Sequence, residues 1–93
     1  MVTNTLLIRL KDRENANQAK ATLLSMEGKI DALRDIQVEI DISSGPASYD
    51  ILLVTRFATM KDMKIYLAHP VHVEVSKYIV RVMESSAAVC YEN

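Results

Sequence analysis

Two strands near the middle of this chain distribute their apolar residues differently, and this contrast restricts the fold more than any other feature. In DIQVEIDI, Asp35–Ile42, apolar and polar residues alternate, which predicts a strand with one buried face and one hydrated face. In YDILLVTRF, Tyr49–Phe57, positions 51–54 are all aliphatic, so both faces of this strand are apolar. A sheet that contains both strands therefore has apolar side chains on two faces.

The other patterns along the chain predict two helical regions and two more strands. Pro70 divides the second helical region, because proline disfavours helical geometry at the residue before it. The predicted elements, in chain order, are a strand at Thr5–Leu10, a helix between Asp12 and Gly28, the strands Asp35–Ile42 and Tyr49–Phe57, a short helix capped by Thr59, a helix that begins at Pro70, and a strand at Ala87–Tyr91. This β-α-β-β-α-β order predicts an α+β, ferredoxin-like protomer whose helices cover one face of a four-stranded antiparallel sheet.

The second apolar face of such a sheet would be left in water by a single copy of the chain. Exposed apolar patches of this kind mark interfaces, and a second copy packed face to face around a two-fold axis would cover the patch. We therefore expect a homodimer formed through the sheet faces. The alternative is that the central strands are aliphatic only because they are central.

Size, charge and cysteine content limit the classes of function. The 93 residues suit a single domain, residues 1–93, and the 11 basic and 12 acidic side chains leave a net charge of -1 with the signs interspersed. No basic stripe suggests nucleic-acid binding, and nothing approaches the run of about 20 apolar residues that a membrane span requires. One cysteine cannot form an internal disulfide, and the N-terminus lacks the apolar run of a signal peptide. We expect a cytoplasmic protein with neither nucleic acid nor membrane as a partner.

The stretch YLAHPVHVEV contains both histidines of the chain, His69 and His72, close to Tyr66. In a catalytic interpretation, His72 takes a proton from a carbon acid, and Tyr66 donates a hydrogen bond to the carbonyl oxygen as it becomes negative. In a structural interpretation, His69 binds carbonyls at the end of one helix while His72 binds the first turn of the next. A metal site would need a third ligand, and none is evident, so we predict no bound metal.

The chain resembles the stress-responsive A/B-barrel domain (Dabb) family of the dimeric α+β barrel superfamily. The resemblance covers nearly the whole chain and is strongest in the Tyr-x-x-His-Pro-x-His run, with support from the SYDILLV strand and the VCYEN end. It implies a ferredoxin-like protomer and a homodimer whose two sheets close into a barrel. It also implies polyketide-cyclase-like chemistry in some members, at a tyrosine and a histidine that match Tyr66 and His72. Asn4 stands where members often have another histidine, and asparagine cannot exchange a proton near neutral pH.

These observations predict a site that binds a small, mostly apolar, carbonyl-bearing ligand between helices and sheet. His72 and Tyr66 are its candidate catalytic residues, and Asn4, Tyr49 and His69 its candidate ligand-binding residues, although Tyr49 alternatively packs between strands. No cofactor is expected, because no nucleotide-binding glycine pattern occurs. Two other functions stay open: a non-catalytic, stress-associated dimeric interaction protein, and a cofactor-free monooxygenase. Met60 and Met63 are predicted as core filler and Cys90 as an unreactive thiol.

Overall fold

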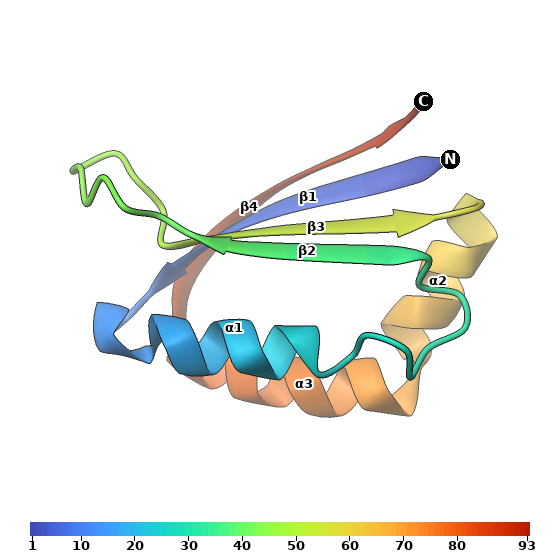
Figure 1. The fold of residues 1–93 in the computed structure, drawn as a ribbon, viewed down its shortest axis with the longest axis horizontal. Coiled ribbons are helices and arrows are strands. Elements are labelled where there is room, and N and C mark those ends of the chain that lie inside the picture. The colour runs from blue at the N-terminus through green and yellow to red at the C-terminus, as the bar shows by residue number, and fades with distance from the viewer.

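The four strands pair in the order β2-β3-β1-β4, all antiparallel, and every helix lies on the same side of the sheet (Figure 1). A computed structural model describes all residues, 1–93. The strands are β1 (Val2–Leu10), β2 (Asp35–Ile40), β3 (Ile51–Phe57) and β4 (Met83–Glu92). The helices are the short 3₁₀ helix η1 (Arg13–Asn15) and the α-helices α1 (Ala16–Leu24), α2 (Met60–Ala68) and α3 (Pro70–Val82). This arrangement confirms the predicted α+β, ferredoxin-like fold.

The first helical region is shorter and less regular than its sequence pattern predicted. Asp12 is the expected cap residue, but its carboxylate accepts a hydrogen bond from the Glu14 N–H (2.9 Å) at the start of η1, before α1 begins. At the other end, α1 stops at Leu24 and the chain continues through turns to Gly28. Gly28 has φ +78°, a left-handed conformation that glycine adopts without steric cost. The helix was predicted to end near Gly28, but it ends at Leu24, and Gly28 lies in the turns that follow it.

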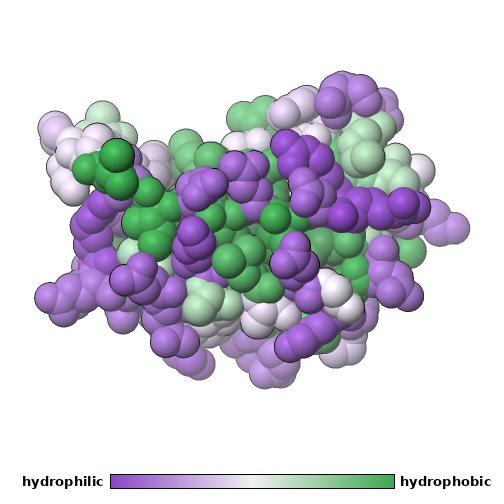
Figure 2. Space-filling model, viewed as in Figure 1, coloured by the Kyte–Doolittle hydropathy of each residue, from purple (hydrophilic) through white to green (hydrophobic).

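The loop between β2 and β3 replaces the outer ends of the two strands predicted there. β2 ends at Ile40 and not at Ile42, and β3 begins at Ile51 and not at Tyr49. The Arg13 guanidinium lies 2.7 Å from a carboxylate oxygen of Asp50 and also binds the Asp41 carbonyl, which closes the base of the loop. The loop projects beyond the sheet (Figure 1), and it carries hydrophobic surface there (Figure 2), where Ile42 is 96% exposed.

The junction between α2 and α3 follows the predicted signals. Thr59 caps α2, because its hydroxyl accepts a hydrogen bond from the Asp62 N–H (3.2 Å). His69 has extended backbone angles (φ -67°, ψ 137°), as expected for a residue before proline. Pro70 then opens α3 at a first-turn position that needs no N–H. The two helices therefore meet at a sharp bend beside the sheet.

The last strand is twice as long as the predicted Ala87–Tyr91. β4 spans ten residues, begins directly after α3, and pairs with β1 from Leu10 opposite Met83 to Val2 opposite Glu92. Its first half contains two serines and a glutamate, which weakened the strand pattern, but pairing with β1 overrides local preference. β4 is an edge strand and is mostly exposed.

The core lies between the helices and the sheet. Its most deeply buried side chains include Ile8, Ile51 and Phe57 from the sheet, Met26 from the turn after α1, and Ile30. No helix covers the other side of the sheet, which we call the outer face (Figure 1). Its apolar and hydroxyl side chains come from alternate positions of β1, β3 and β4: Thr3, Thr5, Leu7, Leu52, Val54, Ala87, Val89 and Tyr91, and the edge strand β2 adds the polar Gln37 and Glu39. Leu7, Val89 and Tyr91 are 37, 65 and 48% exposed, so the predicted second apolar surface exists. No helix of the structure has the length and apolar character needed to cross a bilayer.

Candidate functional site

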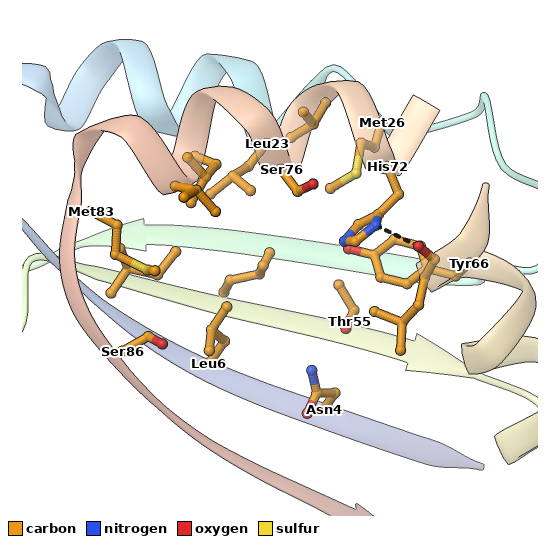
Figure 3. Close-up of a pocket in the computed structure, with 16 residues that line it drawn as sticks. Asn4, Leu6, Leu23, Met26, Thr55, Tyr66, His72, Ser76, Met83 and Ser86 are labelled. Carbon is orange, nitrogen blue, oxygen red and sulfur yellow. Dashed lines mark hydrogen bonds between the residues drawn. The ribbon is translucent and has the colours of Figure 1, made fainter. Parts of the chain in front are cut away.

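A cavity of about 210 Å³ lies between the sheet and helices α1 and α3, next to the junction of α2 with α3 (Figure 3). Eleven of its 16 lining residues are hydrophobic. Leu6 of β1 lies on the sheet side, and Leu23 of α1 and Ile79 of α3 lie on the helix side. The other five lining residues are Asn4, Thr55, His72, Ser76 and Ser86, and Tyr66, one of the eleven, adds a hydroxyl group. A mainly apolar cavity with a few polar groups is the usual form of a small-molecule site.

His72 occupies the first turn of α3 and is half-buried at one end of the cavity. Its Nδ1 lies 3.0 Å from the Leu67 carbonyl oxygen in the last turn of α2. Because a carbonyl can only accept, Nδ1 carries the proton, and Nε2 of the neutral ring keeps an unshared electron pair. Burial lowers the pKa of His72, and the hydrogen bond to Leu67 partly opposes this shift. His72 is therefore a neutral base at pH 7.

Tyr66 lies beside His72 and is 4% exposed. Its ring centroid is 5.0 Å from that of Phe57 and 4.5 Å from that of His72, both in tilted arrangements. Figure 3 shows its hydroxyl next to the His72 ring at the edge of the cavity. Burial raises the pKa of Tyr66 to about 12, so the phenol keeps its proton at neutral pH. Tyr66 can therefore donate a hydrogen bond, but it is not a base.

Asn4 reaches the cavity from β1, on the sheet side opposite the helices (Figure 3). Its side-chain amide can both donate and accept hydrogen bonds, so it can orient a polar group of a ligand. The structure thus brings three of the five candidate residues, Asn4, Tyr66 and His72, to one cavity. They come from β1, α2 and α3, and the bend at Pro70 places the last two together.

The other two candidates, Tyr49 and His69, lie outside this cavity. Tyr49 is in the β2–β3 loop, where the Arg9 guanidinium lies 4.6 Å from the centre of its ring. The Nδ1 atom of His69 accepts a hydrogen bond from the Val71 N–H (3.1 Å) and caps α3. Each histidine thus contacts the helix opposite to the one expected: His69 binds the start of α3, and His72 binds the end of α2.

Sequence reasoning did not single out three polar residues of the cavity, namely Thr55, Ser76 and Ser86. Thr55 is 1% exposed and belongs to the same alternating face of β3 as Leu53, so the strand period predicts its direction. Ser76 follows His72 by four positions on α3, which places both on one helix face. Ser86 lies in the half of β4 that was not expected to be a strand, so no sequence signal indicated it.

The histidines do not combine into a metal centre with other common ligands. Their Nδ1 atoms are used in two separate backbone contacts, with Val71 and Leu67. No group of three or more histidine, cysteine, aspartate or glutamate side chains is placed to hold a metal ion. The cavity is thus best described as an apolar pocket with a basic nitrogen and a phenol at one end.

Comparison with known proteins extends over nearly the whole chain. A family model described as Stress responsive A/B Barrel Domain matches residues 2–93. A dimeric protein of unknown function with a ferredoxin-like fold from Bacteroides fragilis has a TM-score of 0.87 and 29% identity, over 99% of this chain and 95% of that chain. No curated protein matches the sequence.

Two further solved structures have the same fold at lower identity. A dimeric ferredoxin-like protein of unknown function from Thermobifida fusca has a TM-score of 0.87 and 19% identity, over 99% of this chain and 90% of that chain. A hydroxynitrile lyase from Passiflora edulis has a TM-score of 0.81 and 16% identity, over 97% of this chain and 90% of that chain. At these identities the likeness shows the fold alone.

Proposed function

The chain belongs to the stress-responsive A/B barrel domain family, and from this premise we propose that it binds a small, mostly apolar, carbonyl-bearing molecule in the cavity beside His72. The fold is shared by dimers of unknown function and by a lyase, so it does not determine the activity. The proposal depends instead on the cavity: its lining is mainly apolar, and it has a small number of polar groups, two of which lie side by side at one end.

One observation supports acid–base chemistry at this site: a neutral imidazole and a protonated phenol meet at the same end of the cavity. Nε2 of His72 would take a proton from the carbon next to the carbonyl group of the ligand. The electron pair of that C–H bond would move to the carbonyl oxygen, and the Tyr66 hydroxyl would stabilise the resulting enolate by a hydrogen bond. The enolate carbon could then attack a second carbonyl, as in an aldol-type condensation, with no cofactor. Asn4 would hold the opposite part of the ligand.

The experiment uses acetophenone in deuterated buffer, because its methyl protons exchange slowly and their loss is measured by NMR. We expect the parent protein to broaden the ligand signals and to accelerate the exchange. His72→Asn keeps a donor near the Nδ1 position but removes Nε2, so the acceleration should fall about 100-fold or more. Tyr66→Phe removes only the hydroxyl and should also slow exchange, with binding largely retained.

The matched control is His69→Asn, which changes the other histidine and keeps a side chain that can cap α3. This variant should exchange acetophenone protons at the parent rate. If His72→Asn and Tyr66→Phe both fold and keep every ligand interaction of the parent, the site proposal is wrong. The non-catalytic interaction protein then becomes the better account of the chain.

We also propose that the protein forms a homodimer through the outer face of its sheet. Two observations support this: Leu7, Val89 and Tyr91 of that face are exposed in one protomer, and proteins of this fold are described as dimeric. A two-fold axis would place the two outer faces together and bury them in a common core. The cavity lies on the opposite side of each sheet, so a dimer of this kind would contain two separate cavities.

A further inference from the structure

Three sulfur-containing side chains from two distant parts of the sequence, two from α2 and one from β4, lie close together on the helix side of the sheet. The Cys90 Sγ lies 3.6 Å from the Met63 Sδ and 3.9 Å from the Met60 Sδ. We call Met60, Met63 and Cys90 the sulfur cluster. None of the three residues lines the cavity beside His72, so the sulfur cluster is a separate feature of the molecule.

The fold positions these sulfurs through one helix and one strand. The cap at Thr59 sets the start of α2, and Met60 and Met63, three residues apart, lie on one face of that helix. Cys90 lies in β4 opposite Asn4 of β1, and both side chains point to the helix side of the sheet. The side chains of Met60, Met63 and Cys90 therefore bridge the gap between α2 and the edge strand β4.

The donor atoms suit a soft metal ion. Thiolate and thioether sulfurs are soft ligands that select Cu(I) over the hard cations, which prefer oxygen. A metal ion with bonds of about 2.3 Å to sulfur, the length typical of zinc–thiolate bonds, holds three sulfurs roughly 4 Å apart in a trigonal arrangement. The distances from the Cys90 Sγ to the two methionine sulfurs, 3.6 and 3.9 Å, are close to that spacing.

We propose that Met60, Met63 and Cys90 form a binding site for a soft monovalent ion, Cu(I). Binding forms a bond from the ion to Sγ and releases the thiol proton of Cys90 to solvent, while each methionine donates a sulfur lone pair and no atom is oxidised or reduced. An ion can reach the sulfur cluster from solvent, because Cys90 is exposed and Met60 is 46% exposed.

The site is compatible with the proposed dimer. Cys90 points to the helix side, whereas its neighbours Val89 and Tyr91 point to the outer face. A dimer that buries the outer faces therefore leaves the sulfur cluster on the opposite side of β4. Metal binding does not depend on the proposed acid–base chemistry, and each can be tested without the other.

The test titrates the full chain with Ag(I), a redox-inert analogue of Cu(I), and then with Cu(I) under reducing, oxygen-free conditions against a chromophoric chelator. We expect one ion per chain and complete loss of tight binding in Cys90→Ser. A thiol alone binds silver, so the decisive variant is the double substitution Met60→Leu with Met63→Leu, which nearly conserves side-chain volume. It should weaken Cu(I) binding roughly tenfold or more.

Met83→Leu is the matched control, because it removes a thioether that is not part of the sulfur cluster. Its affinity for both ions should equal that of the parent. X-ray absorption of the Cu(I)-loaded parent should show three sulfur neighbours, a measurement that does not require any variant to fold. A single sulfur neighbour, or a double variant that binds Cu(I) as tightly as the parent, would show that Cys90 acts alone and would overturn the proposal.

Discussion

His72 has one ring nitrogen in a backbone hydrogen bond and the other available to a ligand. The contact between Nδ1 and the Leu67 carbonyl selects the tautomer whose Nε2 is basic, and burial beside Tyr66 disfavours the charged ring. The same burial keeps the Tyr66 phenol protonated. The same buried environment thus keeps His72 neutral, as a base must be, and keeps Tyr66 protonated, as a hydrogen-bond donor must be.

The lowered pKa of His72 predicts a dependence of folding stability on pH. Its pKa is near 6.5 in the unfolded chain and lower in the folded protein, so protonation favours unfolding. This contribution is fully present above pH 6.5 and is lost as the pH falls through the folded value. We expect the urea midpoint of the parent to fall on acidification in that range.

In His72→Gln the fall in the urea midpoint between pH 7.5 and 5 should be smaller than in the parent. The pKa of Asp41 is also lowered from 3.8, and the largest cause is the hydrogen bond that its carboxylate accepts from the Ser44 N–H. Asp41 therefore loses its charge at a more acidic pH and does not affect this comparison. An equally steep fall in the parent and the variant would contradict the assignment of this dependence to His72.

Among the elements, α2 carries the most functional groups for its length. Its nine residues include Tyr66 of the cavity and the two methionines of the sulfur cluster, and its last turn supplies the carbonyl that contacts His72. α2 buries only Tyr66, so its position depends on its ends: the Thr59 cap and the bend before Pro70. A short helix with little burial depends strongly on such caps.

Removal of the α2 cap should therefore have a measurable cost. Thr59→Ala leaves the Asp62 N–H without its side-chain acceptor, and we expect a loss of about 1 kcal/mol in the free energy of unfolding. Thr22→Ala is the control, because that hydroxyl binds the Gln18 carbonyl within α1, a contact that does not favour helices. Chemical denaturation of both variants would test this, and equal stabilities would argue against the cap.

At the scale of the whole molecule, the sheet separates two regions with different roles. The helix side contains the core, the cavity and the sulfur cluster, while the outer face presents apolar side chains that one protomer does not cover. β4 is an edge strand that is exposed along most of its ten residues, and its second half is mainly apolar. An exposed edge strand is an aggregation hazard unless something covers it. A second copy packed on the outer face would cover the apolar side chains of that face, including Val89 and Tyr91 of β4.

The dimer can be tested with a charge placed on the outer face. Val89 is 65% exposed in the protomer, so Val89→Lys should leave the protomer folded but would bury an unpaired ammonium in a face-to-face dimer. Light scattering coupled to chromatography should give the parent about twice the 10.5 kDa protomer mass and the variant about one protomer mass. The control, Ile65→Lys, changes a 47% exposed residue of α2 and should stay dimeric. A monomeric parent at micromolar concentration would contradict the proposed dimer.

Local sequence patterns determined the elements, their order and the fold. The alternation at Ile36, Val38 and Ile40, the cap at Thr59 and the proline at position 70 are patterns of residues within a few positions of one another. They can therefore be recognised without coordinates. Strand ends were less predictable: β4 extends back to Met83 because β1 offers a partner along its whole length, and that pairing is not local.

The tertiary structure alone decided which side chains meet. Tyr66, His72 and Asn4 surround one cavity because the bend at Pro70 and the packing of α3 on the sheet bring three elements together. Tertiary contacts also place the Tyr49 ring against the Arg9 guanidinium. They bring the sulfur atoms of Met60 and Met63 in α2 close to that of Cys90 in β4. A local pattern specifies the face on which a side chain lies, whereas its neighbours depend on strand register and helix position, which follow from contacts between residues far apart in the sequence.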